Sequence, residues 1–331
     1  MSLQHLSGAL AASALALAAG CAATNVETMA DDMGADDMRP GRAMAAVPPP
    51  QADDCITDVS PGDHTFVCDG LTFKVMVDEM CTRVACGLIF DIHGAGMTAD
   101  RMRANTELHE LAPPRGYLVV HPSAAGDEGG SWSYDESGAQ MTDFMDRMIA
   151  AFHADESRVH VTGFSMGAAM TFWFMCNHPE KLASVGVVTG SSAAQVRTPD
   201  GSRQCIEAID ADWSPQAPIL FLNGVNDPAL TGEAAQERTD GLVARLGLTG
   251  GEVIAGGETL DENNHYRRRH WEGEDGMALD FIEHDYVAEG RLAGHCMPGA
   301  REVNSTNCTE GDVQLHWGEL ALEWFMDHPK S

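Results

Sequence analysis

The clearest candidate for chemistry is Ser165, which stands at the centre of the sequence GFSMG at positions 163–167. This segment fits the pattern G-x-S-x-G, in which a serine occupies a sharp turn between a strand and a helix. The flanking residues agree, because Val159 and Val161 favour a short buried strand and the apolar stretch 168–176 favours a helix. A serine at a helix start also lies near main-chain N–H groups that stabilise developing negative charge. We therefore predict that Ser165 is a nucleophile.

A nucleophilic serine needs a histidine as its base and a carboxylate that orients the histidine. Where such a turn carries the serine, the acid and then the histidine follow it along the chain. Asp227 comes shortly after the apolar stretch 219–222, which predicts a strand, and it precedes Pro228. We interpret Asp227 as the orienting acid. The alternative is an aspartate that caps a turn before the proline.

Two histidines near the C-terminus are candidates for the base. His295 lies in the sequence GHCMPG at positions 294–299, a loop that follows the strand-like stretch 281–287. His316 opens the last predicted helix, where a histidine is more often a surface cap. Because a loop at the end of a strand can bring its side chain over the serine, we favour His295 and keep His316 as the alternative.

Two main-chain N–H groups are needed to stabilise the oxyanion that forms when the serine attacks a carbonyl group. One belongs to the residue after the nucleophile, which is Met166. The other comes from the loop after an early strand, and the sequence DIHGAGM at positions 91–97 provides such a loop. We assign this second donor to Ala95 by position alone, because main-chain groups have no side-chain signature.

Strand-like and helix-like stretches alternate along the rest of the chain. The apolar stretches 72–77, 87–92, 117–120, 185–188 and 219–222 predict strands, and 141–152 and 232–246 predict helices. This alternation predicts an α/β fold, with a mostly parallel sheet covered by helices on both faces. The length of the segment 55–331 suits one such domain. Its first residues predict a hairpin between Cys55 and Cys68, turning at Pro61.

The N-terminus predicts export. Residues 1–21 have the features of a signal peptide, with an Ala- and Leu-rich run at 10–19 that is too short to span a bilayer as a helix. The run ends at Cys21 in the sequence AAGC, which is similar to a bacterial lipobox and makes Cys21 the candidate for lipidation. Residues 22–54 are rich in Asp, Ala and Pro without a hydrophobic period, which predicts a disordered linker. We expect a protein of the bacterial cell envelope, either secreted or held to the membrane only by a lipid anchor.

The charge of the chain limits its partners. Fifty acidic and 20 basic residues give a net charge of −30. Nucleic acids and anionic membrane surfaces would repel a protein of this charge. We therefore expect no nucleic-acid partner, and we expect a monomer.

The cysteines agree with export. Besides Cys21 there are eight, and an even number after a signal peptide predicts disulfides. Proximity in the sequence suggests the pairs Cys55–Cys68, Cys81–Cys86, Cys176–Cys205 and Cys296–Cys308. No two cysteines have the C-x-x-C spacing, and neither a metal site nor a cofactor is predicted.

Four motifs occur together in this chain: His93-Gly94, GFSMGAAMT at 163–171, NGVNDP at 223–228 and GHCMPG at 294–299. In type and order they resemble the secreted poly(3-hydroxybutyrate) depolymerase and feruloyl esterase group of the α/β-hydrolases. The similarity extends from about Cys55 to the end of the chain. It implies an α/β-hydrolase fold and a serine carboxylesterase whose triad is Ser165, Asp227 and His295.

The sequence also departs from the motifs of that group. Ala168 and Ala293 replace glycines, and Met297 replaces a tryptophan. The resemblance implies that Met297 lines the substrate site, and that Trp132 stands where the group carries a substrate-facing aromatic residue. For Trp132 the alternative is a tryptophan in the core or at the rim.

The expected activity is hydrolysis of a carboxylic ester through an acyl-enzyme, of the polyhydroxyalkanoate depolymerase-like type. One rival keeps this chemistry but directs it to feruloyl or acetyl esters on plant polysaccharide. The other rival is an anchored binding lipoprotein that has the fold without the catalysis. The complete set of serine, aspartate and histidine argues against this last possibility.

Overall fold

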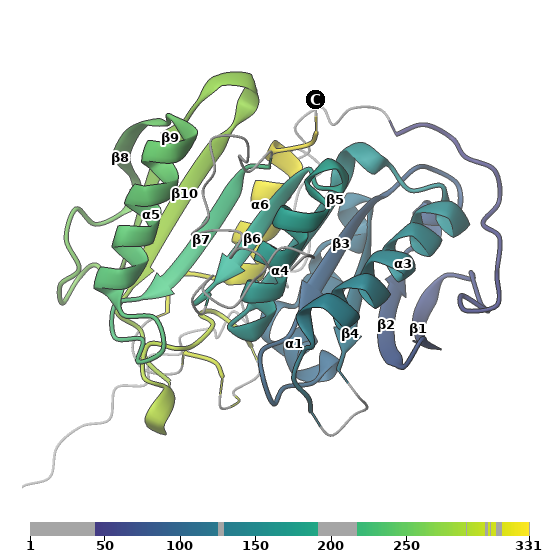
Figure 1. Cartoon of the computed structure of the whole chain (residues 1–331), viewed down its shortest axis with the longest axis horizontal. Coiled ribbons are helices and arrows are strands. Elements are labelled where there is room, and N and C mark those ends of the chain that lie inside the picture. Colours follow the sequence, from purple (N-terminus) through teal and green to yellow (C-terminus); the bar gives the residue numbers. More distant parts are fainter. Residues whose placement is uncertain are drawn as a thin grey trace, which may run out of the picture. The chain divides into compact units, whose positions relative to one another are not determined.

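A sheet of ten strands forms the centre of the folded part (Figure 1). The computed structural model describes residues 44–124, 129–190, 217–288, 290–301, 304, 306–308 and 313–330. In chain order the strands are β1 (Gly62–Cys68), β2 (Leu71–Val77), β3 (Gly87–Ile92), β4 (Tyr117–Ser123), β5 (Val159–Phe164), β6 (Ser184–Val188), β7 (Ile219–Gly224), β8 (Thr249–Gly256), β9 (Tyr266–Glu272) and β10 (Ala278–His284). Their order across the sheet is β1-β2-β4-β3-β5-β6-β7-β10-β9-β8.

The six central strands, from β4 to β10 in that order, are parallel, and the strands at both edges are antiparallel. The central strands are buried along their whole length, as expected for strands that are covered on both faces. Because parallel strands all end at the same edge, the loops after β3, β5, β7 and β10 meet there. This carboxyl edge is where an open α/β sheet binds its ligands.

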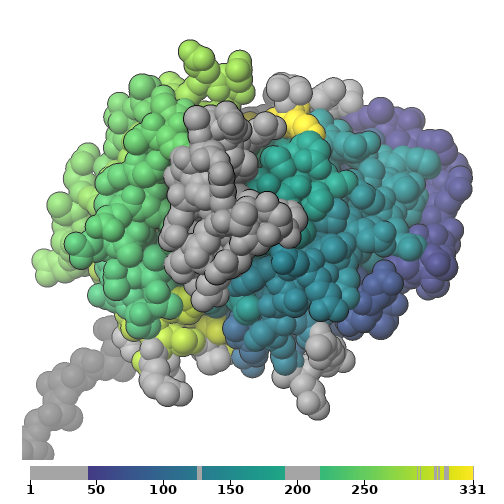
Figure 2. Space-filling view, viewed as in Figure 1, coloured from purple at the N-terminus to yellow at the C-terminus, as the bar shows by residue number. Residues whose placement is uncertain are grey.

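Helices cover both faces of the sheet. They are α1 (Ala99–Thr106), α2 (Leu108–Leu111), α3 (Tyr134–Phe152), α4 (Met166–Asn177), α5 (Gly232–Leu246) and α6 (Trp317–Asp327). In Figure 1 the helices α3, α4 and α5 lie in front of the sheet and α6 lies behind it, and Figure 2 shows α3, α4 and α5 over this front face as packed atoms. The sheet has a hydrophobic core on each face, and side chains along β3 point to the two faces in turn. Leu88 and Phe90 lie in the core under α3 and α4, whereas Ile89 lies in the core under α6.

The expected elements agree with the structure in most places. The strand predicted at 87–92 and the helix predicted at 232–246 have the predicted bounds, and the helix predicted at 141–152 begins earlier, at Tyr134. The predicted hairpin position is wrong. β1 begins at Gly62 and turns into β2 through Asp69 and Gly70, because the pairing of Cys68 with Leu71 closes the turn there.

The folded part also begins before residue 55, where the sequence predicted the end of a disordered linker. Ala46 forms a bridge with Val84, and the N–H of Gln51 donates a hydrogen bond to the carbonyl of Ala151. Arg147 on α3 pairs with the carboxylates of Asp53 and Asp54 at 2.9 and 2.6 Å. These contacts hold residues 44–54 on the domain, and they lie between residues that a sequence pattern does not connect. The predicted signal peptide and residues 22–43 lie outside the described residues.

Three of the expected cysteine pairs are disulfides: Cys55–Cys68, Cys81–Cys86 and Cys296–Cys308. Cys176 is also disulfide-bonded. Its expected partner, Cys205, lies outside the described residues, as does Cys21.

Two buried histidines predict how stability depends on pH. Burial lowers the pKa of His160 from 6.5 to about 3 and that of His284 from 6.5 to about 4. Since both folded-state pKa values lie below the unfolded value, the unfolded chain takes up these protons first as the pH falls. The stabilisation is complete above pH 6.5. It is lost as the pH falls to about 4 for His284 and to about 3 for His160, by on the order of 3 to 5 kcal/mol for each histidine.

Urea unfolding at pH 7.5, 6 and 5 measures this effect, and the free energy of unfolding should fall steadily over the series. His160→Phe should make the fall less steep, since it removes one of the histidines whose pKa burial lowers. A free energy of unfolding that stays constant or rises between pH 7.5 and 5 would contradict the prediction.

Candidate active site

Ser165 occupies a strained turn between β5 and α4. Its φ of 54° and ψ of −111° are unusual for a residue with a side chain. The two glycines of the motif make the turn possible. A Cβ atom on Gly163 would overlap the carbonyl oxygen of Gly167, and one on Gly167 would overlap that of Ile92 at the end of β3. The G-x-S-x-G pattern is therefore explained by the lack of space on both sides of the serine.

The structure brings the three candidate residues of the triad together. The Ser165 hydroxyl donates a hydrogen bond to Nε2 of His295 at 2.8 Å, and Nδ1–H of His295 donates to Oδ2 of Asp227 at 2.7 Å. The other carboxylate oxygen of Asp227 accepts the N–H groups of Ala229 and Leu230 at 2.7 and 3.0 Å. These bonds hold the ionised carboxylate in place, and the carboxylate selects the histidine tautomer that leaves Nε2 free to accept a proton.

The acid and the histidine reach the serine because two loops at the carboxyl edge touch. The loop after β7 carries Asp227, and the loop after β10 carries His295. A Cβ atom on Gly224 would overlap the carbonyl oxygen of Gly294, so the two main chains are in contact there. The N–H of Gly294 donates to the carbonyl of Asn226 at 3.3 Å. The two glycines thus set the spacing between the acid and the base.

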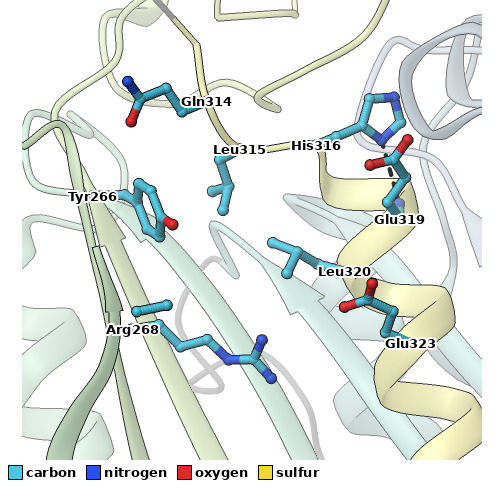
Figure 3. A pocket seen from close by; sticks show the side chains of 9 residues that line it. Tyr266, Arg268, Gln314, Leu315, His316, Glu319, Leu320 and Glu323 are labelled. Atoms are coloured by element: carbon cyan, nitrogen blue, oxygen red, sulfur yellow. Dashed lines mark hydrogen bonds between the residues drawn. The ribbon is translucent and has the colours of Figure 1, made fainter.

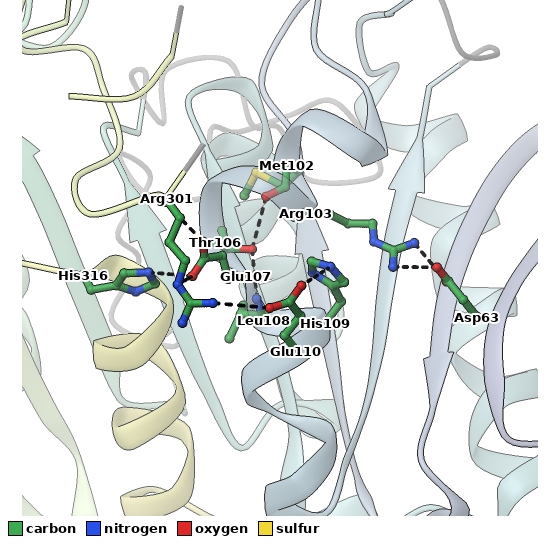
Figure 4. Close-up of polar contacts among 10 residues, drawn as sticks. All are labelled: Asp63, Met102, Arg103, Thr106, Glu107, Leu108, His109, Glu110, Arg301 and His316. Atoms are coloured by element: carbon green, nitrogen blue, oxygen red, sulfur yellow. Dashed lines mark hydrogen bonds and ion pairs between the residues drawn. The ribbon is translucent and has the colours of Figure 1, made fainter. Parts of the chain in front are cut away.

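The segment that follows His295 is anchored to α1. Asn105, at the end of α1, donates to the Thr306 hydroxyl at 2.8 Å and accepts a hydrogen bond from Asn304 at 2.5 Å. Its neighbour Glu107 accepts the N–H of Arg301 at 3.1 Å and forms an ion pair with the guanidinium group of Arg301 (Figure 4). None of these partners was singled out from the sequence, because residues about 200 positions apart carry no local signal of their contact.

His316, the alternative candidate for the base, lies elsewhere. Its Nε2 is 3.1 Å from Glu107 (Figure 4). Its Nδ1 accepts the N–H of Glu319 at 3.3 Å. It therefore caps the start of α6, the role that the sequence suggested for a histidine in that position.

The two predicted oxyanion donors lie on segments that contact each other. Met166 is the first residue of α4, where the helix leaves its N–H groups without partners in the helix. Ala95 lies in the loop after β3, and a Cβ atom on the neighbouring Gly94 would come within 3.2 Å of the Phe164 carbonyl oxygen. Within the described residues, neither the Ala95 nor the Met166 N–H donates a main-chain hydrogen bond. Both predicted donors thus have no main-chain acceptor among the described residues.

The two residues predicted to line the substrate site are buried instead. Trp132 is 4% exposed, and its indole N–H donates to the main-chain carbonyl of His93 at 2.8 Å. Met297 is fully buried in the core under α6, and its main chain bonds to Thr306 and Cys308. The expectation that these side chains face substrate is corrected, because the surrounding packing and the hydrogen bond of the indole leave them almost no free surface.

The described residues contain no group of three or more His, Cys, Asp or Glu side chains that could hold a metal ion. A cavity of about 130 Å³ lies between β9 and α6, lined by Tyr266, Arg268 and Glu323 among others (Figure 3). None of the triad residues lines it. Residues 125–128 and 191–216, which follow the strands β4 and β6 at the carboxyl edge, lie outside the described residues.

No family model matches the chain. A bifunctional acetylxylan esterase/xylanase of Neocallimastix patriciarum is 27% identical over 150 residues, which are 43% of this chain and 19% of the relative. Acetylxylan esterase A of Aspergillus ficuum is 27% identical over 117 residues, 32% of this chain and 38% of the relative. Feruloyl esterase B of Neurospora crassa is 26% identical over 131 residues, 37% of this chain and 44% of the relative. The chain thus spans less than half the length of these relatives.

A solved structure of an acetyl xylan esterase from Aspergillus awamori superposes with a TM-score of 0.56 at 17% sequence identity. The superposition covers 80% of this chain and 99% of that structure. At this identity the likeness concerns the fold. The chain has the α/β-hydrolase fold that its sequence motifs implied.

The two candidate histidines give a direct prediction. His295→Ala should remove ester turnover by a factor on the order of 10⁴ or more, because the serine loses its base. His316→Ala should keep most of the activity and lose about 1 kcal/mol of stability, because it loses a helix cap. Steady-state kinetics and urea unfolding of both variants test this, and the opposite order of activities would show that the base is wrongly assigned.

The Cys296–Cys308 disulfide predicts a second effect. The bond begins at the residue after His295 and closes a ring in which Cys296 and Met297 are buried. Replacing both cysteines by serine should cost about 3 kcal/mol of stability through chain entropy. It should also lower kcat more than it changes KM, because a base displaced by about 1 Å loses up to 10²-fold in rate.

The matched control is Cys55→Ser with Cys68→Ser, which opens a ring of similar length far from the triad in the sequence. This variant should lose stability but keep its kcat. Equal effects of the two double variants on kcat would contradict the link to the base.

Proposed function

We propose that this protein is a serine carboxylic-ester hydrolase with Ser165 as nucleophile, His295 as base and Asp227 as orienting acid. The observation that carries the proposal is the chain of hydrogen bonds from Ser165 through His295 to Asp227, on a serine held in a strained turn. The rival interpretation as a binding lipoprotein without catalysis gives no reason for this arrangement. Relatives that are named esterases support the proposal further.

The mechanism is acyl transfer in two steps. As the Ser165 oxygen attacks the ester carbonyl carbon, its proton passes to Nε2 of His295, and the carbonyl oxygen becomes an oxyanion facing the N–H groups of Ala95 and Met166. The intermediate collapses, and the alcohol leaves with the proton from His295. Water then attacks the acyl-enzyme and gives its proton to His295, and the carboxylic acid is released as the Ser165 hydroxyl forms again. Asp227 stays ionised and stabilises the imidazolium.

For the substrate, we propose acetyl or feruloyl esters of carbohydrate ahead of poly(3-hydroxybutyrate) and its oligomers. The sequence motifs implied the polyester, whereas the names of the curated relatives favour acetylated and feruloylated substrates. A panel of acetylated xylan, methyl ferulate, p-nitrophenyl acetate and hydroxybutyrate oligomers separates these classes. The substrate with the highest kcat/KM identifies the class, and turnover of the hydroxybutyrate oligomers alone would overturn our order.

The disulfides support an oxidising compartment as the site of action. No helix of the described residues is long and apolar enough to cross a membrane. We propose an extracytoplasmic, monomeric enzyme whose contact with a membrane, if it has one, is a lipid on Cys21.

Replacement of the nucleophile tests the activity itself. Ser165→Ala should lower kcat by a factor on the order of 10⁶ without changing the fold. A fluorophosphonate probe should label the wild-type protein at Ser165 and should fail to label the variant. Turnover at the wild-type rate in a folded Ser165→Ala protein would rule out this site as the source of the activity.

A further inference from the structure

The peptide between Gly94 and Ala95 is held in one orientation by His93. Nδ1 of His93 is 2.7 Å from the carbonyl oxygen of Gly94, which belongs to the same peptide unit as the Ala95 N–H. A peptide unit is planar, and in the trans form its N–H and C=O point in opposite directions. Fixing the direction of the Gly94 carbonyl therefore also fixes the direction of the Ala95 N–H.

The bonds of His93 determine its tautomer. The N–H of Ala124 donates to Nε2 of His93 at 3.2 Å, so Nε2 carries a lone pair and the proton is on Nδ1. Of the two neutral tautomers, only this one can donate to the Gly94 carbonyl. The environment agrees, because burial lowers the pKa of His93 from 6.5 to about 4. The imidazole is thus neutral at ordinary pH, and it acts as a fixed donor.

Trp132 holds the main chain of the same loop. Its indole N–H donates to the His93 carbonyl at 2.8 Å, and its ring lies 4.4 Å from the imidazole of His93, centroid to centroid. Two main-chain hydrogen bonds hold the other side of the loop. The N–H of Gly96 donates to the carbonyl of Gly130 at 2.8 Å, and the N–H of Gly130 donates to the carbonyl of Met97 at 3.3 Å. The loop is thus supported on both sides of Ala95.

The two oxyanion donors differ in what holds them. The Met166 N–H is fixed by the start of α4, whereas Ala95 is exposed in a loop that contains two glycines. A glycine-rich loop has many accessible conformations unless other groups restrict it. Its donor therefore needs a separate support. Among the described residues the side chains of His93 and Trp132 provide it, together with the main-chain N–H of Met97, which donates to the Gly94 carbonyl at 3.1 Å.

We propose that His93 and Trp132 are positioning residues, which hold the Gly94–Ala95 peptide so that the Ala95 N–H faces the oxyanion formed at Ser165. The proposal rests on the proposed esterase activity and deepens it. It replaces the substrate-facing role that the sequence suggested for Trp132. Neither side chain touches the reacting atoms, so both act through the main-chain donor.

The test uses Trp132→Phe, which keeps a ring against His93 and removes only the indole hydrogen bond, and His93→Phe, which removes both imidazole bonds. Loss of one oxyanion donor lowers kcat by about 10²–10³-fold. We expect a loss of about 10-fold for Trp132→Phe and about 10²-fold for His93→Phe, with KM nearly unchanged. The affinity for a trifluoromethyl ketone, which forms an oxyanion on Ser165, should fall by the same factors as kcat/KM.

The matched control is Trp173→Phe. Trp173 is also a tryptophan that is 4% exposed, and its indole N–H also makes one hydrogen bond, to Asp135 at 3.1 Å. This variant should keep its kcat and its affinity for the ketone. All activities are expressed per site labelled by a fluorophosphonate at completion, so that a loss of folded protein lowers the number of sites and leaves the rate per site unchanged.

The outcomes separate this inference from the function on which it rests. If the proposed function fails, the wild-type protein itself shows no turnover and no labelling. If only the inference fails, the wild-type protein is active, and Trp132→Phe and His93→Phe have the same kcat per labelled site and the same ketone affinity as Trp173→Phe. A rise in KM at constant kcat would also overturn it, because that result would place Trp132 against the substrate.

Discussion

The candidate site depends on a contact between two main chains, where the start of α4 meets the end of β3. Gly167 lies against the carbonyl oxygens of Ile92 and His93, and no side chain fits between them. The contact brings the N–H groups at the start of the helix beside the loop that carries Ala95. It also requires the strained backbone of Ser165, which the surrounding hydrogen bonds and packing must stabilise. The position of the Ser165 hydroxyl thus depends on how closely the two main chains can approach each other.

The parallel sheet brings the aspartate and the histidine to the serine, which completes the triad. Ser165, Asp227 and His295 follow β5, β7 and β10, which run in the same direction and end at one edge. The serine and the histidine are 130 residues apart in the chain, yet their side chains are within hydrogen-bond distance. Ser165 lies one residue past the end of β5 and Asp227 three residues past the end of β7, whereas His295 lies 11 residues past the end of β10. The rigid sheet supplies the precision that loops alone would lack.

The sequence could predict those features of the fold and the site that a short segment of the chain specifies by itself. The elbow, the strand at 87–92 and the helix at 232–246 each have a local pattern of glycines or apolar residues that specifies them. Asp227 and His295 could be selected because chain order and strand ends restrict the candidates. The same reasoning favoured His295 over His316, since a histidine at a helix start is more often a cap, and the structure shows His316 capping α6.

The sequence could not predict the features that depend on contacts between residues far apart in the chain. The pattern around Trp132 does not show that its indole reaches the His93 carbonyl, and the pattern around Met297 does not show that α6 covers it. The resemblance to a family suggested that both side chains face substrate, but it contained no information on how they pack in this chain. The start of the folded part was misjudged for the same reason, because the pairing of Asp53 and Asp54 with Arg147 joins residues more than 90 positions apart.

The short helix α1 connects the two halves of the site. It begins just after the loop that carries Ala95, where the Thr98 hydroxyl caps its first turn. It ends at Asn105 and Thr106, beside Glu107, which together hold the segment after His295 and contact the start of α6. The Thr106 hydroxyl also donates to the buried carboxylate of Asp91 on β3 at 2.6 Å.

Through these bonds the loop that carries Ala95 and the loop that carries His295 are attached to the two ends of one helix. A shift of α1 along its axis would therefore move both loops together. The distance between His295 and Ala95, the proposed base and the proposed oxyanion donor, is thus set within a single packed unit, even though the two residues lie 200 positions apart in the chain.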